Sequence, residues 1–96
     1  MTPADSSLQR REVHFSGRVQ GVGFRYTTRD IARRFPVVGF VKNLPDCRVL
    51  LVVEGAEACL DPLVEAIRQE MERFIVDVSM ARPPATHAFD HFEIQY

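Results

Sequence analysis

The sequence predicts a single α+β domain in which two helices cover one face of a β-sheet. Strand-like and helix-like patterns follow one another in the order strand, helix, strand, strand, helix, strand. Each helical stretch separates two strands, as in a βαβ unit with a right-handed crossover. The 96 residues, of which 46% are apolar, suit one domain, which we expect to span residues 11–96.

The first strand and the first helix lie in the N-terminal half of the chain. Residues 1–10 are polar and rich in turn-forming residues, so we expect a flexible arm there. In the segment EVHFSG, Val13 and Phe15 alternate with polar residues, which predicts a strand with one buried face. From Phe24 apolar residues recur at helical spacing, and Pro36 ends the helix because the residue before a proline disfavours the helical region.

Two further strands form a predicted hairpin. The segments VVGFVKN, residues 37–43, and CRVLLVVEG, residues 47–55, are rich in β-branched residues. The residues between them, Leu44, Pro45 and Asp46, are typical of a tight turn. We therefore expect the two segments to pair in antiparallel fashion.

The second helix is predicted over residues 57–73, where apolar residues recur every three or four positions. Pro62 would break a helix interior, so we expect Asp61 to be the N-cap, Pro62 the first helical residue and 56–60 an irregular turn. The segment FIVDVSM, residues 74–80, is a predicted strand, and HFEIQY at the end of the sequence is a short final strand.

This order of elements is that of the ferredoxin-like α/β sandwich, β-α-β-β-α-β with a short extra C-terminal strand. Such a fold has an antiparallel sheet with both helices on one face. Many unrelated functions occur on it, so the predicted function has to come from individual residues.

The composition argues against several classes of function. The formal net charge of −1 gives no overall reason to bind nucleic acid or an anionic membrane. The first residues, MTPADSSLQRR, lack the apolar core of a secretion signal, and no apolar run approaches the roughly 18 residues of a membrane span, so we expect a cytoplasmic protein. Two isolated cysteines and three scattered histidines predict neither a disulfide framework nor a metal site.

The segment SGRVQGVGFR stands where the first strand meets the first helix. Three of the five glycines of the chain, Gly17, Gly21 and Gly23, lie here, and Arg25 follows in the first helical turn. Glycines allow successive backbone N–H groups to turn inward around an anion, and an arginine can hold a phosphate or carboxylate by two parallel hydrogen bonds. A tight turn beside a solvated arginine explains the spacing equally well. The pattern matches neither the Walker A loop nor the dinucleotide-binding fingerprint.

Two longer motifs decide between these alternatives. The segment GRVQGVGFR, residues 17–25, resembles the first signature of the acylphosphatase family. The segment GFVKNLPDCRVLLVVEG, residues 39–55, is similar to the second signature, in which a glycine, an aromatic residue and Val-Lys-Asn precede a short turn and a strand ending in glycine. The closing FEI, residues 92–94, resembles the last strand of the family. The resemblance covers residues 11–96.

The resemblance implies hydrolysis of the carboxyl–phosphate bond of acyl phosphates, without a metal or a cofactor. Arg25 matches the phosphate-binding arginine of the family, and Asn43 matches the asparagine that holds the attacking water. The loop whose backbone amides bind phosphate corresponds to Arg18, Val19, Gln20, Gly21, Val22, Gly23 and Phe24. The implied partners are a small-molecule acyl phosphate and inorganic phosphate as a product inhibitor. At this chain length we expect a monomer.

The chain departs from the family pattern at three places. Cys47 stands where the pattern has glycine, just after the hairpin turn. We expect Asp46 to adopt the left-handed conformation in its place, because aspartate tolerates it better than most residues. The segment ERFIV, residues 72–76, lacks a Gly-Pro pair, and Phe35-Pro36 precedes the second strand. We expect these two departures to alter loop geometry and scarcely to affect catalysis.

Two other functions fit the same fold. A non-catalytic module that binds acyl phosphates or other anions would also use a phosphate cradle, but the presence of both Arg25 and Asn43 favours an enzyme. An RNA-recognition domain has the same strand order, yet its stacking motif ends in an aromatic residue on the third strand, whereas here Asn43 ends the second. The net negative charge also disfavours RNA binding.

Overall fold

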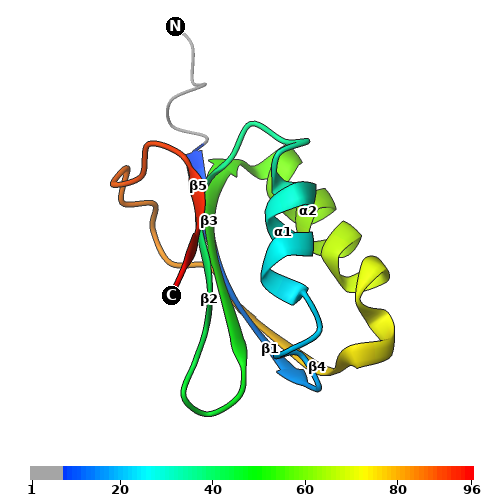
Figure 1. Ribbon diagram of the computed structural model, residues 1–96. Helices are drawn as coiled ribbons and strands as arrows, with labels where there is room; N and C mark the ends of the chain where they lie inside the picture. The colour runs from blue at the N-terminus through cyan, green and yellow to red at the C-terminus, as the bar shows by residue number, and fades with distance from the viewer. Residues whose placement is uncertain (1–7) are drawn as a thin grey trace, which may run out of the picture.

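A β-sheet with two helices on one face makes up the computed structural model, which describes residues 8–96 (Figure 1). The elements in chain order are β1 Leu8–Gly17, α1 Phe24–Ala32, β2 Val38–Asn43, β3 Val49–Ala56, α2 Glu57–Glu70, the 3₁₀ turn η2 Glu72–Phe74, β4 Ile75–Ala81 and β5 Phe92–Gln95. The five strands lie in the order β4-β1-β3-β2-β5. The predicted ferredoxin-like order β-α-β-β-α-β with an extra final strand is confirmed.

The sheet differs from the prediction in the direction of one strand. The pairs β1–β3, β1–β4 and β2–β3 are antiparallel as expected, but β5 runs parallel to β2, so the sheet is mixed. Strand β4 ends beside Glu12 and β5 begins beside Gly39, and both points lie at the same end of the sheet. The chain therefore returns next to β2 and runs in its direction. Residues 82–91 make this connection across the face opposite the helices (Figure 1).

Strand β1 begins earlier than expected. Residues 8–10, predicted to belong to a flexible arm, pair instead with residues 54–56 of β3. The polar side chain of Arg10 is satisfied there, because it forms ion pairs with Glu12 at 2.9 Å and with Glu54 at 2.8 Å. A polar sequence can therefore continue the strand. The remaining residues of the predicted arm, 1–7, lie outside the described part of the chain.

The core lies between the helices and the sheet. Val13 and Phe15 of β1 are fully buried, as their alternation with polar residues predicts. They belong to one apolar cluster with Phe24 of α1 and with Leu63 and Ile67 of α2. The cluster joins both helices to β1, so the glycine-rich loop between β1 and α1 is held at both of its ends.

Helix α2 begins at Glu57, so the expectation that it starts at Asp61 after an irregular turn is wrong. Pro62 lies inside the helix. The earlier start buries Leu60 completely, and burying a leucine stabilises by about 1.5–3 kcal/mol, which offsets most of the ~3 kcal/mol cost of a proline within a helix. The N-cap is Ala56 and not Asp61. The carboxylate of Asp61 accepts a hydrogen bond of 3.3 Å from the buried Arg11.

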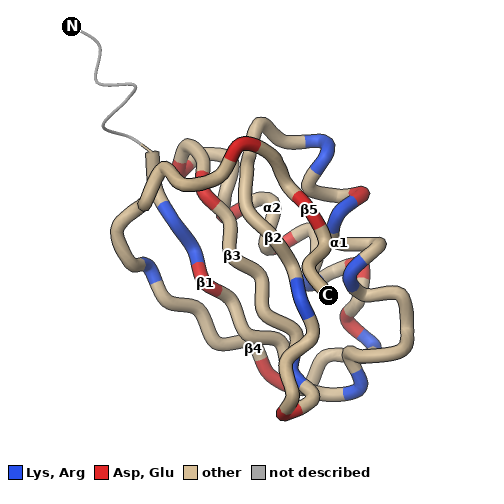
Figure 2. Tube along the Cα trace, turned by 60° about the vertical axis from the view of Figure 1, so that its left-hand side comes forward, with Lys and Arg blue, Asp and Glu red and all other residues tan. Residues whose placement is uncertain are grey.

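Basic residues recur along α1 and just beyond it (Figure 2), where Arg25 and Arg29 are followed by Arg33 and Arg34. Acidic residues in the rest of the chain balance these arginines. The positive charge along α1 is therefore local, and the formal net charge of the chain is −1. Neither of the helices within residues 8–96 has the length and apolar character that crossing a membrane requires.

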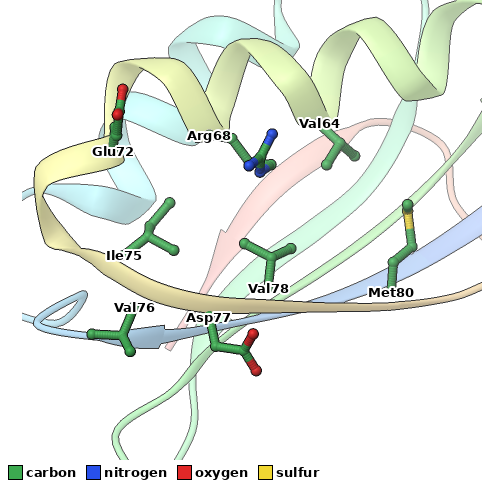
Figure 3. A pocket seen from close by; sticks show the side chains of 8 residues that line it. All are labelled: Val64, Arg68, Glu72, Ile75, Val76, Asp77, Val78 and Met80. Carbon is green, nitrogen blue, oxygen red and sulfur yellow. The ribbon is translucent and has the colours of Figure 1, made fainter.

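A cavity of about 510 Å³ opens between α2 and β4. Val64 and Arg68 of the helix face Ile75, Val78 and Met80 of the strand there (Figure 3). None of the predicted site residues lines this cavity. The predicted chemistry lies in a smaller cavity beside α1.

Candidate active site

The predicted site residues come together at one end of the sheet. Val49, the first residue of β3, pairs with Phe15 of β1 on one side and with Asn43 of β2 on the other. The glycine-rich loop after β1 and the side chain that ends β2 therefore emerge at the same end. Helix α1 begins there too, with Arg25 in its first turn.

A cavity of about 190 Å³ lies between these segments. Its lining consists of the predicted residues Val19, Gly21, Gly23, Phe24, Arg25 and Asn43, together with Tyr26, which the sequence did not predict. Three predicted loop residues, Arg18, Gln20 and Val22, do not line it. Both predicted catalytic side chains and most of the predicted loop thus surround one space.

The loop requires glycine because of its backbone conformation. Gly21 and Gly23 both have a φ of 79°, in the left-handed region that residues with a Cβ resist. A Cβ at either position would meet nothing within 4 Å, so the constraint comes from the dihedral angle and not from lack of space. Left-handed residues in a loop help to turn successive N–H groups to one side, as in an anion-binding nest.

The N-terminus of α1 contributes further donors. Gly23 is the N-cap of this helix, and no side chain among residues 8–96 forms a capping hydrogen bond with it. The first N–H groups of a helix have no partner within the helix, and its dipole favours negative charge at that end. The loop and the helix therefore form one region that suits an anion.

Apolar side chains of the loop serve as anchors. Val19 is fully buried and Phe24 is 2% exposed. The ring of Phe24 packs against that of Phe15, with 5.0 Å between the ring centres, and Val22 packs partly buried against the same core. These contacts hold the loop backbone in place while its glycines line the cavity.

Two polar residues of the predicted loop have structural contacts. The backbone N–H of Arg18 donates to the carbonyl of Phe74 at 2.9 Å, so the expected binding of phosphate by this amide does not fit the geometry. The side-chain Nε2 of Gln20 donates to the carbonyl oxygens of Leu44 and Arg48, at 2.9 and 3.0 Å. Gln20 therefore ties the glycine-rich loop to the hairpin turn that follows Asn43.

Asn43 is the last residue of β2 and lines the cavity. Its side-chain Oδ1 is buried and has no hydrogen-bond partner among residues 8–96. A buried acceptor without a partner costs about 1–3 kcal/mol. A donor that enters the cavity, such as a water molecule, would remove that cost, so the side chain can hold and orient water.

Arg25 lies beside two tyrosines that the sequence did not predict as site residues. Its guanidinium carbon is 4.9 Å from the centre of the Tyr96 ring. The hydroxyl of Tyr96 lies 3.3 Å from that of Tyr26. Tyr96 reaches the site because β5 pairs in parallel with β2, and the sequence carries no signal for that pairing.

The charge next to the cavity is positive. Arg25 lines the cavity, and the guanidinium carbon of Arg29 lies 5.3 Å from the centre of the Tyr26 ring. Within residues 8–96 no carboxylate forms an ion pair with Arg25. The same residues contain no group of three or more His, Cys, Asp or Glu side chains that could hold a metal ion. The site offers cationic and N–H donors to an anionic ligand.

The hairpin turn after Asn43 differs from the prediction. Cys47, and not Asp46, has the left-handed backbone, with a φ of 77°. The N–H of Cys47 donates to the carbonyl of Leu44 at 3.1 Å, and the N–H of Leu44 donates to the carbonyl of Arg48 at 2.8 Å. These bonds describe a turn closed by a left-handed residue, as in three-residue hairpin loops. Cys47 is therefore a strained residue.

Asp46 has another role in this turn. Its carboxylate accepts hydrogen bonds from the backbone N–H of Arg48 at 3.1 Å and from the Nε of the same residue at 2.8 Å. The backbone N–H of Arg48 lowers the pKa of Asp46. The bond from Cys47 to Leu44 makes Pro45 the second residue of the turn, a position that favours proline. Pro45 and Asp46 are therefore its central residues, and the left-handed position falls to Cys47.

Comparison with known proteins gives consistent relatives over the whole domain. A family model described as acylphosphatase matches residues 11–94. The acylphosphatase of Archaeoglobus fulgidus is 39% identical over 85 residues, covering 88% of this chain and 96% of the relative. That of Syntrophus aciditrophicus is 40% identical over 90 residues, covering 93% and 94%. The crystal structure of acylphosphatase from Bacillus subtilis matches with a TM-score of 0.80 at 35% identity, covering 93% of this chain and 99% of that chain.

Proposed function

Because this chain belongs to the acylphosphatase family and hydrolyses the carboxyl–phosphate bond of acyl phosphates, we propose that Arg25 and Asn43 carry out that hydrolysis. One observation carries the proposal. Both side chains line one cavity of about 190 Å³, with an uncapped helix N-terminus beside it. Among residues 8–96, Arg25 has no carboxylate partner and the Asn43 Oδ1 has no hydrogen-bond partner.

In the proposed complex, the phosphoryl group occupies the cavity next to the loop. The guanidinium of Arg25 donates two parallel hydrogen bonds to phosphoryl oxygens. Backbone N–H groups of residues 19–24 surround the remaining oxygens, and Gly21 and Gly23 allow the loop to close around them. The amide of Arg18 is excluded from this set because it already donates to Phe74.

Asn43 orients the water that attacks phosphorus. As the new P–O bond forms, the bond between phosphorus and the acyl oxygen breaks, and the carboxylate leaves with the electron pair. An amide cannot accept a proton from the water, so a phosphoryl oxygen takes it and inorganic phosphate is released. Phosphoryl transfer through a loose transition state depends mainly on positioning and charge stabilisation, which Asn43 and Arg25 provide.

The proposed mechanism requires no metal or cofactor. The carboxylate is a good leaving group and needs little acid catalysis. Arg25 and the loop N–H groups supply the positive charge that the transition state requires. A module that binds acyl phosphates without turnover is the alternative, and membership of an enzyme family does not favour it.

We also propose that the protein works as a cytoplasmic monomer that inorganic phosphate inhibits competitively. The product is an anion of the same shape as the group bound in the cradle, so it competes for the same donors. Both cysteines, Cys47 and Cys59, are free thiols, as is usual in a reducing compartment. Light scattering coupled to size exclusion measures the mass in solution and tests the monomer.

Phosphate release from purified protein tests the proposal. Acetyl phosphate and benzoyl phosphate should be hydrolysed in excess EDTA, whereas phosphomonoesters, which lack a carboxylate leaving group, should not. Inorganic phosphate should raise the apparent KM without changing kcat. Loss of activity on chelation with recovery on adding a divalent ion would overturn the metal-free mechanism, and binding of acyl phosphate without release of phosphate would support the binding module.

A further inference from the structure

We infer that Tyr96 is a positioning residue for Arg25, whose guanidinium it orients by contact with its ring face while leaving the N–H donors free for the substrate. The inference rests on the proposed role of Arg25 in binding the phosphoryl group. It adds to the reaction a residue that lies beyond the glycine-rich loop and beyond the hairpin.

The contact between the two side chains is close enough for a cation–π interaction. The guanidinium carbon lies 4.9 Å from the centre of the Tyr96 ring, within the ~6 Å over which such pairs attract. Six of the ten other arginines have a carboxylate within 4.0 Å, namely Arg10, Arg11, Arg29, Arg33, Arg48 and Arg68. Arg25 has no carboxylate partner among residues 8–96 and contacts the ring of Tyr96.

The choice of partner matters for a phosphate-binding arginine. A carboxylate would take up N–H donors of the guanidinium and offset its charge, so it would compete with a phosphoryl group. The face of an aromatic ring attracts the cation through its quadrupole and accepts none of these donors in a conventional hydrogen bond. Tyr96 therefore restricts the motion of Arg25 without using its capacity to bind an anion.

A second tyrosine holds Tyr96 in place. The hydroxyls of Tyr96 and Tyr26 are 3.3 Å apart, and the guanidinium carbon of Arg29 lies 5.3 Å from the centre of the Tyr26 ring. The two hydrogen-bonded rings thus lie beside Arg25 and Arg29, two cations four residues apart on α1. The hydrogen bond with Tyr26 raises the pKa of Tyr96 above its ordinary value.

The fold explains why Tyr96 lies at the site. Gln95, the residue before it, pairs with Lys42, the residue before Asn43. The end of β5 therefore lies at the same end of the sheet as the cavity. Tyr96 is 89% exposed, so it contributes little to the core, and replacing it should leave the fold intact.

Three substitutions at this position distinguish the effect of the aromatic ring face from the effects of side-chain size and of the hydroxyl group. For Tyr96→Ala and Tyr96→Leu, we expect the inhibition constant of inorganic phosphate to rise about two- to five-fold, the range expected for an exposed cation–π pair. The value of kcat/KM for acetyl phosphate should fall by a similar factor. Tyr96→Phe keeps the ring and should stay within about two-fold of the unaltered protein. The melting temperature of each should be unchanged, and Val76→Ala, an equally exposed change on β4, serves as the control.

A double variant tests whether Tyr96 acts through Arg25. In an Arg25→Ala background, measured at raised enzyme concentration, Tyr96→Ala should cause no further fall in kcat/KM. An equal fall in both backgrounds, or a Tyr96→Leu variant that matches the unaltered protein, would overturn the inference. If Arg25→Ala alone keeps near-normal hydrolysis, the proposed role of Arg25 fails. If Arg25→Ala abolishes hydrolysis and Tyr96→Leu has no effect, only the inference about Tyr96 fails.

Discussion

The two ends of the β-sheet differ in whether their polar groups have hydrogen-bond partners within the protein. At the end where β3 finishes, the carboxylate of Glu54 is completely buried and accepts hydrogen bonds from the protein itself. Its donors are the guanidinium of Arg10 at 2.8 Å, the backbone N–H and hydroxyl of Thr86 at 2.8 and 2.9 Å, and the backbone N–H of His87 at 3.0 Å. These bonds hold the connection between β4 and β5 against the outer face of the sheet.

At the opposite end, where β2 finishes, two polar groups lack such partners within residues 8–96. The partly buried Arg25 has no carboxylate partner, and the Oδ1 of Asn43 is buried without a hydrogen bond. A protein tolerates unsatisfied groups when a ligand satisfies them, whereas it must satisfy permanently buried charges itself. The comparison indicates that the Glu54 end stabilises the fold, whereas the groups at the Arg25 end are free to bind a ligand, as the proposed function requires.

The largest expected effect is at the Arg25 end. Arg25→Ala should lower the rate of acyl-phosphate hydrolysis by about 10³–10⁵, the value of an arginine that contacts a transferring phosphoryl group. Arg25→Lys should recover little, because lysine lacks the bidentate fork. Steady-state kinetics with acetyl phosphate measure both, and the melting temperature should not change. Near-normal turnover in the alanine variant would break the comparison, since the unpaired arginine would then have no catalytic use.

The next largest expected effect concerns Glu54 and is on the free energy of unfolding. Burial raises the pKa of this carboxyl, but the N–H of Thr86 and the guanidinium of Arg10 outweigh it and lower the pKa to about 2, from an ordinary 4.5. A carboxyl whose pKa is lowered in the folded state stabilises the fold at pH values above its ordinary pKa. This stabilisation is lost as the pH falls from about 4.5 to about 2. Since a shift of that size corresponds to about 3 kcal/mol, Glu54→Gln should lose stability of that order at pH 7.

Urea denaturation at several pH values measures this effect. The difference between the unaltered protein and Glu54→Gln should shrink as the pH falls from 5 to 2, while catalysis by the folded variant stays close to normal. Glu65→Gln is the matched control, because Glu65 forms an exposed ion pair with Arg68 and should cost less than about 1 kcal/mol. A large loss of kcat in Glu54→Gln at full folding would show that the two ends are not separate in function.

The next prediction, with a smaller expected effect, separates the role of Asn43 from that of Arg25 at the same end of the sheet. Asn43→Ala should lower kcat about 10²-fold, because a misplaced nucleophile loses much of the advantage of orientation. The inhibition constant of inorganic phosphate should change little, since Arg25 and the loop hold the anion. Product-inhibition kinetics on the variant measure both quantities. A matched loss of phosphate affinity would mean that Asn43 binds the phosphoryl group and does not orient water.

The smallest effect concerns Cys47. A left-handed conformation costs a residue with a Cβ about 1–2 kcal/mol, and a glycine at this position avoids that cost. Part of the gain is offset because glycine increases the conformational entropy of the unfolded chain. Cys47→Gly should therefore stabilise by about 1 kcal/mol, measured as the midpoint of urea denaturation. Cys47→Ala keeps the Cβ and should show no such gain. The kcat should change less than about two-fold, because Gln20 holds the turn through Leu44 and Arg48 in either case.

The features that could be predicted from the sequence depend on short, continuous stretches of the chain. The alternation of Val13 and Phe15 predicted the buried face of β1. The two catalytic candidates, Arg25 and Asn43, came from two motifs that resemble the acylphosphatase family. Each depends on neighbours within a few residues. Local backbone chemistry is enough to place Arg25 at a helix start and Asn43 at a strand end.

The features that it did not predict depend on distant residues. Leu60 extends α2 past the start that Pro62 suggests because the core, formed by other elements, buries it. Arg10 continues β1 because Glu54 of β3 pairs with it. Tyr96 lies beside Arg25 only through the parallel pairing of β5. Such effects of tertiary contacts cannot be read from spacing along the chain.

The edge position of β5 has a consequence for motion. This strand is four residues long and pairs only with β2, whereas β1 and β3 each lie between two neighbours. Opening of a short edge strand costs far less free energy than global unfolding, so the amide protons of β5 should exchange with solvent much faster than those of β1. We expect such an opening to release Tyr96 while α1 and the loop stay folded. If Tyr96 orients Arg25 as proposed, a local equilibrium at the sheet edge sets the fraction of molecules in which Arg25 is oriented.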